Sequence, residues 1–387
     1  MLSSLRIIAR HTPRFVSCSS KNVSVTTNKR LFLSKIASFF GGEGKAKEES
    51  DKAYGDMIDA VRELSGGQHG LPLSSGGVLQ DRSSISGDKL RELDGQDLNL
   101  LSVQQLIELA RCHYDGNFGD GGEVRVNKTR AVTVWKLVAQ KEPSNSEAKY
   151  CLSASLRTGE GTNRDAAAAF LLMNELANKH DYYLAHYDLA VMYSTNEGVA
   201  PSPRNDFEAL KHFRRAAKEG IRPALYNIAN LLAAGRGVEN KNQEHVAAKY
   251  YQEAAEAGDP AAMFTLGAWY VQGRGGLTKN NKKAFDLQCR AGQEGHPGAM
   301  YNAACHLMAG QGCDVDVPLA AQWFQRCVDV ANLPEACVNL GNLYRDGHPG
   351  LPVDWEKAKS LYARHSMTHE GCRTNLFLLH QMIKEGK

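Results

Sequence analysis

Three side chains near the end of the chain have the types and spacing to bind a metal ion. His365, His369 and Cys372 follow one another at i, i+4 and i+7, so a helix would place them on one face. A structural zinc site needs four imidazole or thiolate ligands, and the sequence offers no evident fourth. His365 also stands where the corresponding upstream segments carry Ala, which favours a packed or surface histidine. We therefore predict no metal site.

Other candidate ligand loops and catalytic motifs are equally incomplete. Gly pairs such as Gly273 and Gly275 follow predicted helices, whereas a phosphate-binding loop follows a strand. The loop 115–126 resembles a calcium loop, but Asp120 stands at the sixth position, where glycine is required. The chain has no nucleophile elbow, no HExxH motif and no convincing catalytic triad. We predict no catalytic residue and no cofactor.

These residues belong to a pattern that recurs through the last three-quarters of the chain. Each copy begins with Ala, followed by an apolar residue four on, a small residue, a large residue and Gly, as in AMYNAACHLMAG from Ala299. The anchor alanines lie 37, 39, 38, 37 and 37 residues apart, and a weaker copy starts near Gln105. They are Ala148, Ala185, Ala224, Ala262, Ala299 and Ala336. A fixed period of this length indicates a solenoid of stacked units.

Each copy has a second half with its own helical periodicity. Ala209, Phe213, Ala216 and Ala217 stand at i, i+4, i+7 and i+8, which is one face of a helix. Gly220 then closes the copy, where a left-handed helix end favours glycine. Each repeat is therefore predicted to be an antiparallel pair of helices that buries its apolar face against its neighbours.

This signature resembles the Sel1-like repeat, a relative of the tetratricopeptide repeat. The family pattern is A-x-x-x-L-G-x-x-Y-x-x-G-x-G, and the copy from Ala262 matches it at Leu266, Gly267, Tyr270 and Gly273. The resemblance covers residues 101–387. It implies an all-α, right-handed solenoid of about seven helix-turn-helix repeats, with residues 371–387 as a C-terminal capping helix. It also implies a non-catalytic adaptor that binds protein partners, typically in complex assembly or stress signalling.

By analogy with tetratricopeptide repeats, the position two residues after each anchor faces a concave groove, and it is aromatic in most copies. Aromatic side chains in a groove suit peptide binding, although they would equally pack neighbouring repeats against each other. Arg157 and Arg345 flank mostly small or apolar groove positions, which suggests a partner segment with an apolar centre and acidic flanks. The candidate groove residues are Tyr150, Arg157, Tyr187, Tyr226, Asn230, Phe264, Tyr301, Met308, Asn342 and Arg345, and Cys305 is a further candidate.

Residues 1–40 differ from the rest of the chain in charge. They hold seven Lys or Arg and no acid, and Arg6, Arg10 and Arg14 would share one helical face. This composition is typical of a mitochondrial targeting presequence, and the chain has no apolar run long enough for a transmembrane helix. Without this segment, 39 basic residues stand against 43 acidic ones, which argues against nucleic-acid binding. Residues 41–100 read as a flexible linker with a possible short helix at 54–64.

The nine cysteines leave one alternative open. Most fall within predicted helices, where a free buried thiol packs as a small apolar residue. Cys327 and Cys337 have a nine-residue separation, which would suit a disulfide-bearing assembly factor of the intermembrane space. A hydrolase resembling β-lactamases and a secretory-pathway adaptor, the latter supported only by the Asn22 glycosylation motif, are further alternatives. Our prediction is a mitochondrial adaptor of the matrix or intermembrane space that binds protein partners, with peripheral attachment to a mitochondrial membrane left open.

Overall fold

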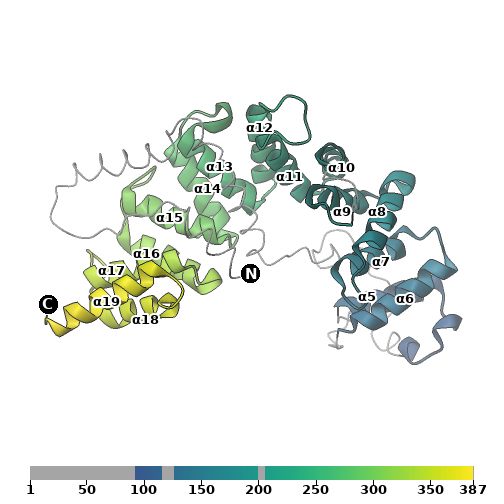
Figure 1. Ribbon diagram of the computed structural model, residues 1–387, viewed down its shortest axis with the longest axis horizontal. Coiled ribbons are helices and arrows are strands. Elements are labelled where there is room, and N and C mark those ends of the chain that lie inside the picture. The colour runs from purple at the N-terminus through teal and green to yellow at the C-terminus, as the bar shows by residue number, and fades with distance from the viewer. Residues whose placement is uncertain (1–91, 116–125, 199–204, 387) are drawn as a thin grey trace. The chain divides into compact units, whose positions relative to one another are not determined.

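The computed structural model describes residues 92–115, 126–198 and 205–386, and these residues form fifteen α-helices and two short 3-10 helices. The helices follow one another without a strand in these ranges (Figure 1). Their bounds are η1 (Leu98–Leu100), α5 (Val103–Asp115), α6 (Lys128–Lys141), α7 (Ser146–Thr158), α8 (Ala166–His180), α9 (Tyr183–Thr195), α10 (Asp206–Lys218), α11 (Arg222–Ala233), α12 (Glu244–Glu256), α13 (Pro260–Gln272), η2 (Arg274–Gly276), α14 (Asn281–Gln293), α15 (Pro297–Ala309), α16 (Val317–Ala331), α17 (Pro334–Asp346), α18 (Trp355–His365) and α19 (Glu370–Lys384).

The helices form two compact units, one containing α5–α13 and the other α14–α19. Within them, consecutive helices pack as pairs: α5 with α6, α7 with α8, α9 with α10, α11 with α12, α15 with α16, and α17 with α18. The first helix of each repeat is the one that carries the anchor alanine, and the second helix follows it. The all-α repeat architecture predicted from the period is confirmed. The predicted targeting segment 1–40, the predicted linker up to residue 91 and the loop residues 116–125 lie outside the described residues.

Local sequence explains where the helices begin and end. The side chains of Asp259 and Asn205 cap the starts of α13 and α10 by accepting a backbone N–H, and Pro297 stands at the first turn of α15, where its missing N–H costs nothing. The first helices α7, α9, α13, α15 and α17 end at a residue with positive φ, as at Gly310. In the copy where the sequence has Asn196 instead of Gly, the asparagine takes the same left-handed conformation, with φ of 58°.

The second glycine of the Gly-x-Gly pairs has a different role, which is to permit close contact between repeats. A Cβ atom on Gly237 would lie 2.4 Å from the carbonyl oxygen of Asp206, at the start of the preceding repeat's second helix. The same clash would occur between Gly312 and Asn281. These glycines are therefore required by packing between neighbouring backbones, and they are turns rather than phosphate-binding loops.

The core consists of the anchor alanines and the large residues that pack around them. Each anchor from Ala148 to Ala336 is fully buried, and Tyr251, Phe213 and Phe324 of the second helices are at most 1 % exposed. Residues just before residue 101, the predicted start of the repeats, also contribute to the core. Leu93 is 2 % exposed and belongs to the core around α5 and α6, and Asp94 contacts His113 and Arg130.

Candidate functional site

The ten predicted groove residues lie on one stripe of the first helices, at the positions two, six and nine residues after the anchor alanine. We call this the first-helix stripe. In α7 it is Tyr150, Ala154 and Arg157; in α9, Tyr187, Val191 and Ser194; in α11, Tyr226, Asn230 and Ala233; in α13, Phe264, Ala268 and Val271; in α15, Tyr301, Cys305 and Met308; in α17, Val338, Asn342 and Arg345. The repeat register therefore brings these residues to equivalent places on successive first helices.

The tyrosines of the stripe tie each first helix to the next one. The Tyr150 hydroxyl donates to the Asp188 carboxylate at 2.7 Å, across the junction between α7 and α9. The side-chain amides of Asn227 and Asn339 donate to the hydroxyls of Tyr187 and Tyr301 at 3.3 and 3.0 Å. Each partner stands three residues after the next anchor, so the contact repeats with the period of the array. Burial and the nearby Asp188 carboxylate raise the pKa of Tyr150, so its phenol stays protonated as a donor.

The two arginines of the stripe are also held by the following repeat. The Arg157 guanidinium donates to Asp188 at 2.8 Å and to Glu197 at 3.1 Å. Arg345 is 9 % exposed and donates to Asn375, which stands three residues after the anchor position of α19, and to Asp346 at 2.7 Å. Since carboxylates already neutralise both guanidinium groups, they contribute to the packing between repeats rather than presenting charge to acidic flanks of a partner.

The asparagines of the stripe are oriented from inside their own repeat. The hydroxyl of Tyr251, in the second helix α12, donates to the Asn230 side-chain oxygen at 2.6 Å. Tyr362 of α18 donates in the same way to Asn342 at 2.8 Å. Asn342 is buried, whereas Asn230 is half-buried, so its amide N–H groups lie where a partner's carbonyl groups could accept hydrogen bonds.

Part of the stripe is half-buried, and Tyr187 and Arg157 belong to this part although both contact the next repeat. Tyr226, Asn230 and Phe264 are half-buried on α11 and α13 of one unit. Cys305 and Met308 are half-buried on α15 of the other unit, while Tyr150, Tyr301, Asn342 and Arg345 are buried. The structure thus separates the predicted set into residues that join repeats and a smaller set that presents aromatic, amide and apolar groups.

A pair of buried histidines inside one repeat was not predicted from the sequence. Nδ1 of His186 in α9 lies 2.8 Å from Nδ1 of His212 in α10, and Nε2 of His186 lies 2.8 Å from an Asp181 carboxylate oxygen. A hydrogen bond between two Nδ1 atoms requires that only one of them carries a proton. At most one of the two imidazoles can therefore become a cation without breaking that bond. Burial and the neighbouring His186 lower the pKa of His212 to about 4. Hydrogen bonds from Arg215 and His186 lower the pKa of Asp181 to about 2.

The possible zinc ligands and the cysteines have structural contacts. Nδ1 of His369 accepts the backbone N–H of Cys372 and caps α19, and within the described ranges no group of three or more His, Cys, Asp or Glu is arranged to hold a metal ion. All eight cysteines of the described residues are free thiols. Burial raises the pKa of both Cys327 and Cys372 to about 12, so both are protonated and poorly nucleophilic at neutral pH.

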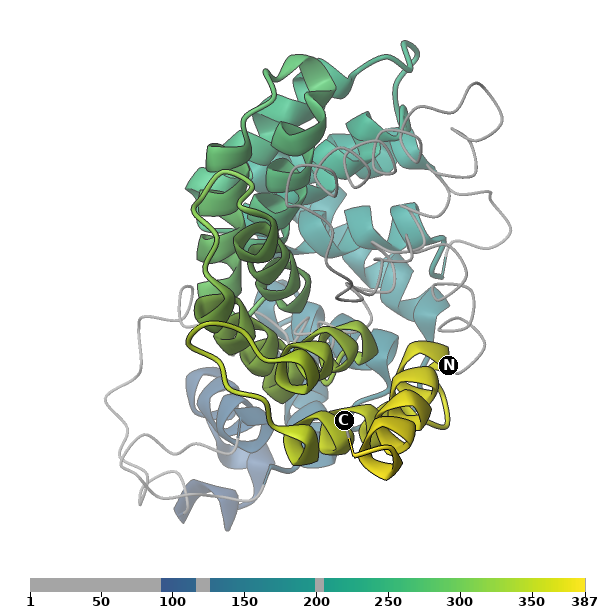
Figure 2. The same ribbon diagram turned by 90° about the vertical axis from the view of Figure 1, so that its left-hand side faces the viewer.

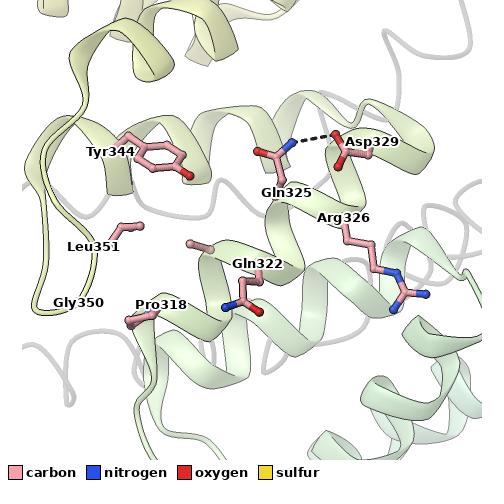
Figure 3. A pocket seen from close by; sticks show the side chains of 9 residues that line it. Pro318, Gln322, Gln325, Arg326, Asp329, Tyr344, Gly350 and Leu351 are labelled. Atoms are coloured by element: carbon pink, nitrogen blue, oxygen red, sulfur yellow. Dashed lines mark hydrogen bonds between the residues drawn. The ribbon is translucent and has the colours of Figure 1, made fainter.

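A surface cavity of about 370 Å³ lies in the unit that contains α14–α19 (Figure 3). Its side chains supply amide, carboxylate, guanidinium and phenol groups, without a paired nucleophile and base, and Gln325 donates to Asp329 at 2.8 Å. The lining residues are Pro318, Ala321, Gln322, Gln325, Arg326 and Asp329 of α16, Tyr344 of α17, and Gly350 and Leu351 of the following loop. Outward positions of the second helices follow no repeat rule, so the sequence carried no signal for this cavity.

Comparison with known proteins agrees with this architecture. A family model for the Sel1 repeat matches residues 146–181, 184–221, 222–259, 260–296, 297–326 and 334–364, which together make up more than half of the chain. The chain belongs to the Sel1 repeat family. Sel1 repeat proteins are protein-interaction scaffolds and are typically non-catalytic. The matched stretches begin with α7 and end within α18, so α5, α6 and α19 of this Sel1 repeat protein lie outside them.

One solved structure shows the same fold, and a second is a more distant match. A Sel1 repeat protein from Oxalobacter formigenes is 24% identical, with a TM-score of 0.52, over 61% of this chain and 90% of its own. A protective antigen with an SLR fold, present in uropathogenic Escherichia coli strains, is 19% identical with a TM-score of 0.38, over 93% of this chain and 91% of its own. Comparison with curated proteins finds no significant match. No helix in the described part of this Sel1 repeat protein has the length and apolar character needed to cross a membrane.

Proposed function

We propose that this Sel1 repeat protein is a mitochondrial adaptor that binds a segment of a partner protein on the part of the first-helix stripe formed by α11 and α13. The observation that carries the proposal is that Tyr226, Asn230 and Phe264 are all half-buried on α11 and α13, whereas Tyr150 at the equivalent position of α7 is buried. Aromatic side chains beside an oriented amide combine apolar contact area with donors for a peptide backbone.

The chemistry of this surface indicates the kind of segment it would bind. Phe264 and Tyr226 offer ring faces and edges, and Tyr251 fixes the orientation of the Asn230 amide. Arg157 lies at the α7–α9 junction and is already paired with Asp188 and Glu197, so acidic flanks in the partner are no longer required. The proposed partner segment is therefore apolar or aromatic, with backbone carbonyl groups that accept from Asn230.

The mitochondrial part of the proposal rests on the composition of residues 1–40, which hold seven basic residues and no acidic one. Respiratory-complex assembly and mitochondrial stress signalling are the processes proposed, because adaptor proteins of this repeat class work in such settings. The matrix and the intermembrane space are both compatible with the proposal.

Proximity labelling tests both parts. The full chain is compared with a version lacking residues 1–40, and with two full-length variants, Phe264→Lys on the stripe and Phe207→Lys on an exposed face of α10. We expect mitochondrial neighbours that disappear without residues 1–40, and a subset that disappears with Phe264→Lys but is retained with Phe207→Lys. If the labelled neighbours are cytosolic and do not change after truncation, the proposed mitochondrial location is wrong. Retention of every neighbour by a folded Phe264→Lys variant would remove the binding surface.

A further inference from the structure

The last helix, α19, is the first helix of a further repeat. Cys372 takes the anchor position and is fully buried, and α19 packs against α17 and α18 (Figure 2, where α19 is yellow). Every earlier first helix is followed by a second helix along the chain, whereas within the described residues no second helix follows α19.

The face of α19 that a second helix would cover is built differently from that face in the other repeats. Five residues after the anchor, every other first helix from α7 to α17 has a small buried residue: Ser153, Ala190, Ala229, Gly267, Ala304 and Gly341. A Cβ atom on Gly341 would lie 2.4 Å from a ring atom of Tyr362, so even one methyl group exceeds the space between the paired helices α17 and α18. In α19 this position is Phe377, and it is 62 % exposed. A second helix of the usual kind cannot pack there at the usual distance.

The charges beside Phe377 make this face complementary to itself. Glu370, Phe377 and Lys384 stand at i, i+7 and i+14, so they follow one line along α19, and all three are exposed. An antiparallel copy of the helix, centred on Phe377, would place each Glu370 opposite Lys384 of the second copy and the two phenylalanine rings together. A parallel copy would place Glu370 against Glu370 and Lys384 against Lys384, which is repulsive.

We propose that α19 pairs antiparallel with α19 of a second copy of this chain and gives a two-fold symmetric dimer. The contact is isologous, because the same line of residues serves both partners. Leu378 and Ile383 are 42 % and 40 % exposed but lie about 100° and 120° around the helix from Phe377, on opposite sides of it, so Phe377 alone supplies the apolar centre of the contact. Two helices of 15 residues bury less area than a standard interface of about 1,600 Å², so we expect a weak and reversible dimer.

The oligomeric state of the full chain tests the proposal. In sedimentation velocity between about 1 and 100 μM we expect a monomer–dimer equilibrium, and Phe377→Asp should leave only monomer because it places two like charges at the centre of the contact. Phe207→Asp is the matched control, since Phe207 is 59 % exposed on α10 and should leave the equilibrium unchanged. A wild-type chain that stays monomeric, including one in which another segment of the same chain covers Phe377, overturns the proposal.

The two charges decide whether the pairing is antiparallel. Glu370→Lys and Lys384→Glu should each weaken dimerisation at least about tenfold, because each replaces two attractions with two repulsions. An equimolar mixture of the two variants should dimerise again, since the heterodimer places lysines opposite glutamates at both ends. Circular dichroism of each variant checks that α19 stays helical, and fraying would not be repaired by mixing. A mixture as monomeric as its components overturns the antiparallel arrangement, as does a dimer that neither charge reversal affects.

Discussion

The junction between α7 and α9 and the junction between α9 and α11 occupy equivalent places in neighbouring repeats, yet they are held together differently. At the first, Tyr150 and Arg157 both donate to the Asp188 carboxylate. At the second, the partner is Asn227, a neutral amide that donates to Tyr187. The same positions thus form a charged network in one repeat, whereas in the next a neutral hydrogen bond joins Tyr187 and Asn227. The repeat determines where side chains meet, and the residue types determine how strongly they hold and what remains exposed.

The largest expected effect is on the free energy of unfolding, which should fall more when the buried tyrosine of α7 is removed than when the half-buried tyrosine of α11 is removed. Tyr150→Ala should lower the free energy of unfolding by about 3–5 kcal/mol, because it removes a side chain that is 2 % exposed together with its hydrogen bond. Tyr226→Ala should cost roughly half as much, since its ring keeps contact with solvent. Urea unfolding of the full chain measures both values. Tyr150→Phe, which removes only the hydroxyl, is the control and should cost about 1–2 kcal/mol. Equal costs at Tyr150 and Tyr226 would contradict the distinction between the two regions.

The second comparison concerns the interiors of two repeats. Where α9 and α10 place His186 and His212 together, α11 and α12 have Leu225 and Tyr250 at the same positions. The pKa of His212 is about 4 in the folded chain, below its ordinary 6.5. As pH falls from 6.5 toward 4, His212 binds a proton in the unfolded chain but not in the folded chain. The free energy of unfolding should therefore fall by about 1.4 kcal/mol per pH unit, roughly 3 kcal/mol in all. Below pH 4 this loss should level off, because His212 is then protonated in both states. Asp181 stays ionised across this window because its pKa is about 2.

The double variant His186→Leu, His212→Tyr gives this repeat the residues of its neighbour. We expect its stability at pH 5 to decline less, relative to its own value at pH 7.5, than that of the wild-type chain. Thermal unfolding at several pH values measures the difference, and the other histidines are common to both proteins. Parallel pH profiles of the two proteins would show that the histidine pair does not couple folding to pH.

Much of the fold could be predicted because its determinants are local and repeated. Each helix pair packs like the next. The repeated anchor alanines and closing glycines were therefore enough to predict the helix pairs and the terminal helix α19. The contact from tyrosine to the third residue after the next anchor was also present in the sequence, as Tyr150 with Asp188 and Tyr301 with Asn339, both 38 residues apart. Packing between neighbouring repeats was one of the two interpretations of position two, but helical periodicity alone does not identify the partner residue.

The accessibility of the stripe could not be predicted from the residues alone. Arg157 and Arg345 have the composition of binding residues, and only the distances to Asp188 and Asn375 show that the following repeat already engages them. Likewise, the meeting of His186 with His212 depends on the lateral register of α9 and α10, which hydrophobic periodicity does not specify.

The smallest expected effect comes from the ion pair between Arg157 and Asp188. It tests whether this ion pair makes the α7–α9 junction different in stability from the α9–α11 junction. At the α9–α11 junction the positions of Arg157 and Asp188 are occupied by Ser194 and Asn227. Arg157→Ala should cost about 1–2 kcal/mol, because the ion pair is only partly exposed, with side-chain exposures of 17% and 16%. Asp188→Asn should cost a similar amount, and the double variant should cost less than the sum of the two, by about 1 kcal/mol, since each change alone leaves a partly buried charge with one ionic partner fewer. Urea unfolding of the four proteins gives this coupling energy. Strict additivity would mean that the α7–α9 junction is held by Tyr150 and apolar packing alone, and that the two junctions differ in residue type but not in how they are stabilised.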